Sequence, residues 1–270
     1  MRSSKLSPHT RTGIGSSKMR TERSRLDGAT VVLTGVSRGI GRALCKLLIA
    51  EGATVAAVAR DATALAGLRD ALGDRVVPFA CDLSKVAARD ELIDAVTGRF
   101  GSIDGLINNA AVQTEMSFTS GNVGDIAQKS AQEIEINLTA PVHLVSRFLP
   151  IMSGRAAPFI VNLTSGLAIA PKEAAPVYSG TKAGLRSFTK ALRYQAQSSC
   201  PELCVTEVIM ALVDTDMTRG RGRGKISAER AAAEIVEAIV AGKHEVWVAK
   251  AKMLPILARV SPGIPERLLR

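Results

Sequence analysis

The chain has 270 residues, of which 46% are apolar and 22% are charged, and this ordinary globular composition excludes intrinsic disorder of the whole chain. Only one Trp, two Tyr and six Phe are present, so Ala, Val, Leu and Ile must fill the core, as in a parallel sheet covered by helices. The net charge of +10 is unevenly distributed along the chain, since residues 1–25 hold seven basic side chains and only one acidic one, Glu22. The rest of the chain has a net charge of only about +4, which argues against nucleic acid as a partner.

Residues 1–26 form a first segment that is rich in Ser, Thr and Arg and lacks a periodic apolar face, which predicts a disordered basic tail. Three interpretations are open for it: an Arg-rich targeting peptide, a tail for an anionic partner, or an extension upstream of a natural start at Met19. No apolar run approaches the roughly 20 residues of a membrane span and no secretory signal is present. We therefore expect a cytoplasmic protein without a transmembrane segment.

Short β-branched runs alternate with Ala- and Leu-rich helical patterns from residue 27 to residue 250. We predict strands at residues 30–34, 53–59, 75–80, 103–108, 159–164, 204–210 and 245–249, with the first helices at 40–50 and 61–72. This alternation predicts right-handed crossovers and one α/β domain, a doubly wound Rossmann fold with a parallel sheet of about seven strands. Residues 251–270 are then a C-terminal extension, and chemistry is expected at the carboxyl ends of the strands.

A glycine-rich turn joins the first strand to the first helix. It reads Thr34, Gly35, Val36, Ser37, Arg38, Gly39, Ile40, Gly41. Glycines here let backbone amides approach a pyrophosphate at the helix N-terminus, although an ordinary turn is the alternative. The G-x-x-x-G-x-G spacing differs from the G-x-G-x-x-G fingerprint and resembles the cofactor loop of the short-chain dehydrogenase/reductase family.

Further residues follow the order of that family. Asn109 and Ala110 close a strand as in its N-N-A-G segment, with Ala111 in place of the final glycine. The resemblance implies a catalytic set, which consists of Asn137, Ser165, Tyr178 and Lys182.

Tyr178 and Lys182 are four residues apart and share one helix face, so we expect the ammonium to lower the pKa of the tyrosine from about 10. Tyr178 is then the general acid in reduction or the base in oxidation. By the resemblance, Ser165 hydrogen-bonds the reacting oxygen, Lys182 also holds the cofactor ribose, and Asn137 orients a water that leads to Lys182. An enoyl reductase of the same fold is disfavoured because it would place the tyrosine further from the lysine, where this chain has Ala175.

The end of the second strand indicates which nicotinamide cofactor binds. The acidic position that would reject a 2′-phosphate falls on Ala59, while Arg60 and Arg38 can pair with that phosphate, which predicts NADP(H). Asp61 as a ribose ligand is the alternative. Asp82, followed by Leu83, resembles the family residue that hydrogen-bonds the adenine, with a helix cap as the other interpretation.

The segment after the sixth strand departs from the family. Met210 and Ala211 stand where Pro-Gly is usual, which leaves the geometry of the nicotinamide pocket open, whereas Val213 and Thr215 retain the carboxamide clamp. The glycine- and arginine-rich run 218–225 is either a solvated loop or a basic lid for an acidic substrate. Residues 251–270 either pack over the cleft or a subunit interface, or lie on a membrane surface.

The sequence therefore predicts an NADP(H)-dependent oxidoreductase that interconverts a carbonyl and an alcohol, acts on a small molecule, and by the resemblance assembles as a homodimer or homotetramer. A catalytically impaired cofactor-binding regulatory or scaffold protein is the alternative. The four cysteines and three histidines show no metal-ligand spacing, so no metal is expected. Cys200 and Cys204 are either half-buried thiols or a redox pair.

Overall fold

The computed structural model describes residues 24–220, 224–261 and 263, and within them seven strands form one sheet. The strand order is β3-β2-β1-β4-β5-β6-β7, and every neighbouring pair is parallel. The strands are β1 (Thr30–Thr34), β2 (Thr54–Ala59), β3 (Val76–Ala80), β4 (Gly105–Asn108), β5 (Phe159–Ser165), β6 (Cys204–Met210) and β7 (Glu245–Trp247). The predicted doubly wound Rossmann fold in a single α/β domain is confirmed.

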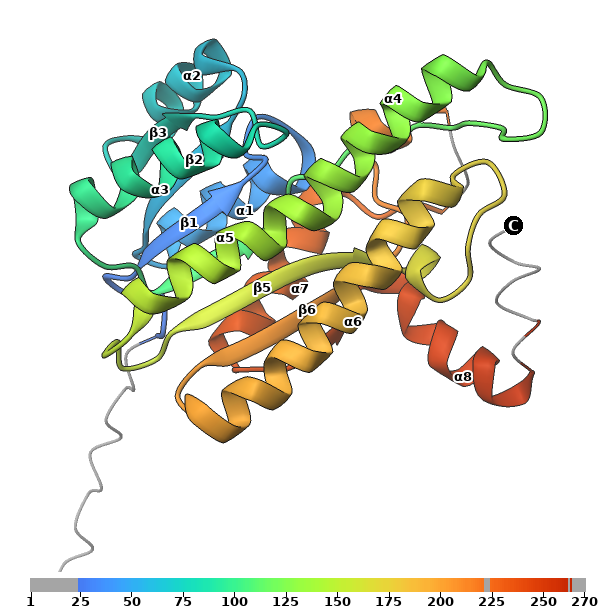
Figure 1. Cartoon of the computed structure of the whole chain (residues 1–270). Coiled ribbons are helices and arrows are strands. Elements are labelled where there is room, and N and C mark those ends of the chain that lie inside the picture. Colours follow the sequence, from blue (N-terminus) through green and yellow to red (C-terminus); the bar gives the residue numbers. More distant parts are fainter. Residues whose placement is uncertain (1–23, 221–223, 262, 264–270) are drawn as a thin grey trace, which may run out of the picture.

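Helices cover both faces of the sheet (Figure 1). The α-helices are α1 (Gly39–Ala50), α2 (Ala62–Leu72), α3 (Val86–Phe100), α4 (Val123–Ile134), α5 (Ala140–Phe148), α6 (Pro176–Ser199), α7 (Ala228–Val240) and α8 (Leu254–Val260). The short ones are the π-helix η1 (Glu135–Thr139) and the 3-10 helices η2 (Leu149–Met152), η3 (Gly166–Ala168), η4 (Asp216–Thr218) and η5 (Ala249–Met253).

Two separate apolar layers follow from the alternation of side chains along each strand. Val31 and Leu33 of β1 pack in a core with α1, α2 and α7, whereas Val32 packs on the other face with α3, α5 and α6. Because both faces are buried, the strands are apolar at most positions rather than only at alternate ones.

Four of the observed strands are shorter than predicted: β2 and β3 each begin one residue later, and β4 and β7 each lose two residues. β7 ends at Trp247 because Ala249 adopts a left-handed φ of 51° and turns the chain into η5. β4 begins at Gly105 because the preceding Asp104 makes hydrogen bonds to Thr30 with both its side chain and its backbone. Its Oδ2 accepts from Thr30 N at 2.8 Å, and its own backbone N donates to Thr30 O at 2.8 Å.

The two ends of the chain differ from the predicted domain boundaries. Leu26, assigned above to the tail, is fully buried in the core, and Arg25 Nη1 donates to Ile239 O at 3.4 Å, so the folded domain includes residues 24–26. The rest of the predicted tail, residues 1–23, lies outside the described residues. At the other end, Ala251 and Leu254 pack against Ile209, so this part of the extension belongs to the fold. No helix in the described ranges combines the length and the apolarity that crossing a bilayer requires.

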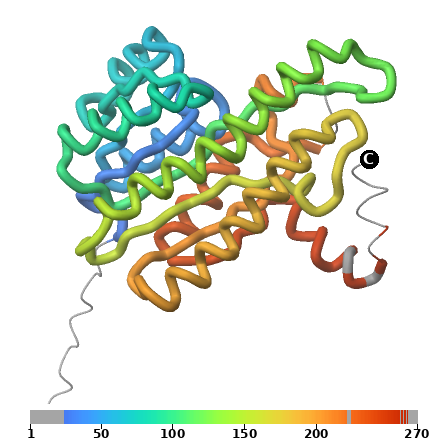
Figure 2. Tube along the Cα trace, viewed as in Figure 1, coloured from blue at the N-terminus to red at the C-terminus, as the bar shows by residue number. Residues whose placement is uncertain are grey.

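α4, η1 and α5 form one continuous rod from residue 123 to residue 148, drawn in green in Figure 2. The order of the sheet reverses between β1 and β4, and such a switch point leaves a crevice beyond the carboxyl ends of the strands. The rod passes beside α6 near this end of the sheet, since α6 contacts both α4 and η1.

Candidate active site

A cavity of about 740 Å³ lies at the carboxyl ends of the strands. Most of the residues that the sequence singled out line it: Gly35, Ser37, Arg38, Ile40, Gly41, Arg60, Asp82, Leu83, Asn109, Ala110, Ser165, Tyr178, Lys182, Val213 and Thr215. Thr34, Gly39 and Asn137 do not line it, and each has a different place in the structure.

The glycine turn is closed by backbone contacts that leave no room for a side chain. A Cβ on Gly41 would lie 2.0 Å from Gly35 O, and a Cβ on Gly35 would lie 2.8 Å from Asn109 Nδ2. Gly39 has a φ of +55° and packs against Thr215. The turn therefore requires glycine at these positions.

Hydrogen bonds between Thr34 and the segment at Asn109 hold this turn in place. Asn109 Nδ2 donates to Thr34 O at 2.8 Å and to Gly35 O at 3.1 Å, while the buried Thr34 Oγ1 accepts from the backbone N of Asn109 and of Ala110 at 3.1 and 3.0 Å. Thr34, predicted as a cofactor ligand, thus holds the loop rather than facing the cavity.

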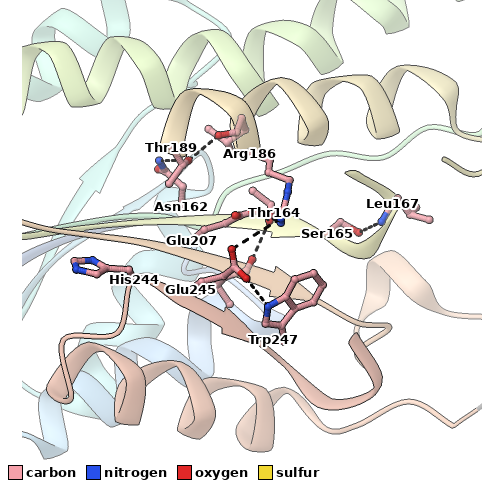
Figure 3. Close-up of polar contacts among 12 residues, drawn as sticks. Asn162, Thr164, Ser165, Leu167, Arg186, Thr189, Glu207, His244, Glu245 and Trp247 are labelled. Carbon is pink, nitrogen blue, oxygen red and sulfur yellow. Dashed lines mark hydrogen bonds and ion pairs between the residues drawn. The ribbon is translucent and has the colours of Figure 1, made fainter. Parts of the chain in front are cut away.

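The reactive side chains meet between β5 and α6. Ser165 ends β5, and its Oγ accepts from Leu167 N at 3.2 Å (Figure 3) and shares a hydrogen bond with the Tyr178 side chain. Lys182, one turn after Tyr178 on α6, is buried and donates from Nζ to Leu163 O at 2.8 Å. Burial lowers the pKa of Lys182 to about 8.

The pKa of Tyr178 moves in the direction opposite to the expected one. Burial raises it to about 12, and the charge of Glu133 adds to the rise, against the hydrogen bond with Ser165. The predicted lowering by Lys182 is wrong for this state of the protein, because Lys182 Nζ is bonded to a backbone carbonyl and lies 5.8 Å from the centroid of the tyrosine ring.

An ion pair fixes α6 against the strands that end at the cavity. Arg186, one turn after Lys182, contacts Glu207 of β6 with Nη1 at 2.9 Å from Oε1, and Thr164 Oγ1 donates to the same oxygen at 2.7 Å (Figure 3). Because Thr164 adjoins Ser165, these contacts set the position of α6 relative to Ser165.

Asn137 lies in the π-helix and is completely buried. Its Oδ1 accepts from Val112 N at 2.9 Å, and its Nδ2 donates to Val112 O at 2.8 Å and to Thr181 Oγ1 at 3.3 Å. The side chain that was predicted to orient a water is therefore occupied in holding the loop after β4 to α6.

Of the residues predicted to select the cofactor, Arg38, Ala59 and Arg60 line the cavity and Asp61 does not. Asp61, the alternative ribose ligand, is instead the N-cap of α2 and accepts from Ala64 N at 3.0 Å. Asp82 accepts from Ser84 N and Oγ rather than capping α3, whose N-cap is Lys85. Although burial opposes it, the Ser84 hydrogen bonds and the charge of Arg60 hold the pKa of Asp82 below its usual value.

The segment that departs from Pro-Gly still forms a wall of the cavity. Met210 and Ala211 both line it, and Thr215 caps η4 in a reciprocal arrangement with Thr218. Of the predicted basic lid, Arg219 pairs with Asp216, and Lys225 Nζ donates to Thr218 O at 2.6 Å. Arg221 and Arg223 lie outside the described residues.

The sequence did not identify a further part of the cavity wall, which we call the substrate-side wall on the basis of the function proposed below. It is formed in part by Gln113, Ile136, Leu167, Lys172, Met217, Lys250, Ala251 and Leu254. The prediction that the C-terminal extension packs over the cleft points to Ala251 and Leu254, whereas the others come from loops and short helices that no sequence pattern singled out. Cys200 and Cys204, the two cysteines for which a redox pair was one interpretation, are free thiols.

The residues present fit a dinucleotide. The glycine cradle, formed by Gly35, Gly39 and Gly41, has no room for a side chain at these positions. Arg38, the N-cap of α1, makes no capping hydrogen bond, so the first backbone amides of the helix have no side-chain partner at the place where a pyrophosphate would bind.

Comparisons with known proteins agree with this geometry. Residues 29–225 match the family model of short chain dehydrogenases. The chain is 32% identical over 229 residues to an uncharacterized oxidoreductase, DltE, of Bacillus subtilis, which covers 82% of this chain and 88% of that protein. It is 29% identical to the ketoacyl reductase HetN of Nostoc, over 91% of this chain and 89% of that one.

A solved structure shares the architecture. A short chain dehydrogenase from Burkholderia cenocepacia in complex with NADP is 26% identical, with a TM-score of 0.77 over 91% of this chain and 99% of that one. With the family model matching most of the chain, the protein belongs to the short-chain dehydrogenase/reductase family of oxidoreductases.

Proposed function

We propose that the protein is an NADP(H)-dependent oxidoreductase that interconverts a carbonyl and an alcohol, with Tyr178 as the general acid and base. The observation that carries this proposal is the meeting of Ser165, Tyr178 and Lys182 in one cavity whose other end is the glycine cradle. Bound nicotinamide supplies or accepts the hydride. The residues of the chain bind the substrate oxygen and move the proton.

In reduction, the hydroxyls of Ser165 and Tyr178 hydrogen-bond the carbonyl oxygen, and the proton of the Tyr178 hydroxyl passes to that oxygen as negative charge develops. A pKa of about 12 keeps this proton in place at neutral pH. Lys182, whose pKa is lowered to about 8, can lose and regain a proton at Nζ close to neutral pH and would also hold the ribose.

The preference for NADP(H) rests on Arg60 and Arg38. Both line the cavity, and Asp61 is engaged as a helix cap, which removes the nearest carboxylate competitor for the ribose. The remaining proposed ligands of the cofactor are Gly35, Ser37, Gly39, Ile40, Gly41, Asp82, Leu83, Asn109, Ala110, Val213 and Thr215. Cytoplasmic location and assembly as a homodimer or homotetramer complete the proposal.

A cofactor-binding scaffold without turnover is the second candidate, favoured by Met210 and Ala211 in place of Pro-Gly. The test that separates the two is NADPH oxidation with a panel of ketones, aldehydes and ketoacyl thioesters. We expect turnover with at least one class, and loss of at least about a thousandfold in Tyr178→Phe with cofactor affinity unchanged.

Tyr194→Phe is the matched control, since Tyr194 is the other tyrosine of the chain and is 56% exposed on the same helix. Turnover by Tyr178→Phe within tenfold of the parent would exclude Tyr178 as the acid. Cofactor binding without turnover on any of these substrates would favour the scaffold.

A further inference from the structure

The last turn of α4 carries a carboxyl group in a fully buried position. Glu133 has 0% exposure, and its Oε1 accepts from Thr114 N at 2.5 Å. Its other oxygen, Oε2, is buried and has no hydrogen-bond partner. A carboxyl group in such surroundings has a cost in stability, so its retention calls for a role in the site beside it.

Glu133 and Asn137 together hold the loop that follows β4. Asn137 binds both backbone groups of Val112, at 2.9 and 2.8 Å, and Glu133 binds the backbone N of Thr114. The residue between them, Gln113, lines the cavity. The two side chains, four residues apart on one rod, therefore fix the backbone on both sides of a residue of the substrate-side wall.

The charged groups on the neighbouring elements have partners of their own. Glu115 of the loop pairs with Lys172 at 2.7 Å. Glu135 of η1 contacts Arg89 at 2.6 Å, and Asp125 of α4 pairs with Lys129 at 2.6 Å. Lys182 of α6 is bonded to a backbone carbonyl. Among the ion pairs of the described residues, Glu133 thus has no cation, and burial raises its pKa against the hydrogen bond from Thr114.

The same carboxyl group acts on the catalytic tyrosine. The charge of Glu133 raises the pKa of Tyr178, so it disfavours the phenolate at high pH. Glu133 does not line the cavity, so any effect it has on the reaction passes through other residues.

We propose that Glu133 is a positioning residue of the reaction: through its hydrogen bond to Thr114 it fixes the cavity wall at Gln113. This inference rests on the proposed function. It makes separate predictions for two variants, because a glutamine keeps the acceptor for Thr114 N and loses the charge, whereas an alanine loses both.

In Glu133→Ala, we expect KM for the carbonyl substrate to rise about tenfold and amide hydrogen exchange at Thr114 to accelerate, since one hydrogen bond to a charged group is lost. In Glu133→Gln, we expect KM and the exchange rate to stay near the parent values. The pH profile of turnover governed by Tyr178 should shift to lower pH in the glutamine variant. Asp125→Asn removes the same charge from an exposed site of α4 and should change none of these measurements.

Two readouts do not depend on turnover. Amide exchange at Thr114 reports how firmly the loop after β4 is held. In a Tyr194→Phe background the ultraviolet absorbance of phenolate reports the ionisation of Tyr178 alone, because the chain has only two tyrosines. A protein that turns over no substrate would refute the proposed function and leave both readouts measurable. Unchanged amide exchange at Thr114 in Glu133→Ala would overturn the role of Glu133, and a Tyr178 titration that shifts to lower pH in Glu133→Gln would support it.

Discussion

Replacing Lys182 by methionine should stabilise the cofactor-free protein near neutral pH while abolishing its proposed turnover. The amine is 3% exposed, and burial lowers the pKa of Lys182 from 10.5 to about 8. At about 1.36 kcal/mol per pKa unit, keeping this ammonium in the folded protein costs on the order of 3 kcal/mol.

The sign of the pH dependence follows from proton binding. Below about pH 8 both the folded and the unfolded chain hold the proton, and the folded state bears the whole cost. Between about pH 8 and 10.5 only the unfolded chain still holds it, so the stability of the parent increases with pH. Above 10.5 neither state is charged and the cost is gone.

The assay is urea unfolding of parent and variant over this pH range. We expect the free energy of unfolding of Lys182→Met, relative to the parent, to be higher near pH 7 than above pH 10.5 by roughly 3 kcal/mol. The lost hydrogen bond to Leu163 O contributes at both ends of the range and largely cancels in this difference. Lys190→Met, an exposed lysine of the same helix, is the control. A difference that does not vary with pH, or that grows with it, would refute the reasoning.

Three further expectations concern cofactor, fold and thiols. Arg60→Ala should reduce the ratio of kcat/KM with NADPH to that with NADH by about tenfold or more, and an unchanged ratio would show that Arg60 is only solvated. Gly41→Ala should lower Tm and weaken cofactor binding because its Cβ meets Gly35 O at 2.0 Å, whereas Gly67→Ala in α2, with no atom within 4 Å, should not lower Tm. Burial raises the pKa of the Cys45 thiol to about 12. Alkylation of the native protein should therefore be much slower at Cys45 than at the half-buried Cys200, and peptide mass mapping can measure both rates. Equal alkylation rates would contradict this expectation.

The sequence predicts the fold well because the strands are buried on both faces. Runs such as 31–33 and 204–210 are apolar or β-branched at nearly every position, and the helices between them are long enough for crossovers. The strand ends are less predictable, since they depend on tertiary contacts. Asp104 adds a side-chain hydrogen bond to Thr30 beside its backbone one, and the φ of Ala249 ends β7. Neither feature is encoded in a local pattern.

The site divides in the same way. Glycines, Ser165 and the Tyr178–Lys182 spacing can be identified from the chain because their chemistry requires those residue types at those intervals. Residues of the substrate-side wall, such as Lys250 and Leu254, come together only through packing of the segment after β7. Glu133 lies in a helix in which half of the residues are polar, and there the sequence alone does not distinguish a buried carboxyl group from an exposed one.

Helical spacing fixes which face two residues share, but it does not fix where a long side chain ends. Tyr178 and Lys182 do share a face of α6, yet the lysine reaches past the ring to Leu163 O, and burial then governs both groups. Burial favours the neutral form of each, which raises the pKa of the phenol and lowers that of the amine. Tyr178 consequently holds its proton, as the acid proposed for reduction must, and the proposed oxidation of an alcohol would first have to overcome the same burial, together with the charge of Glu133, before the tyrosine could act as a base.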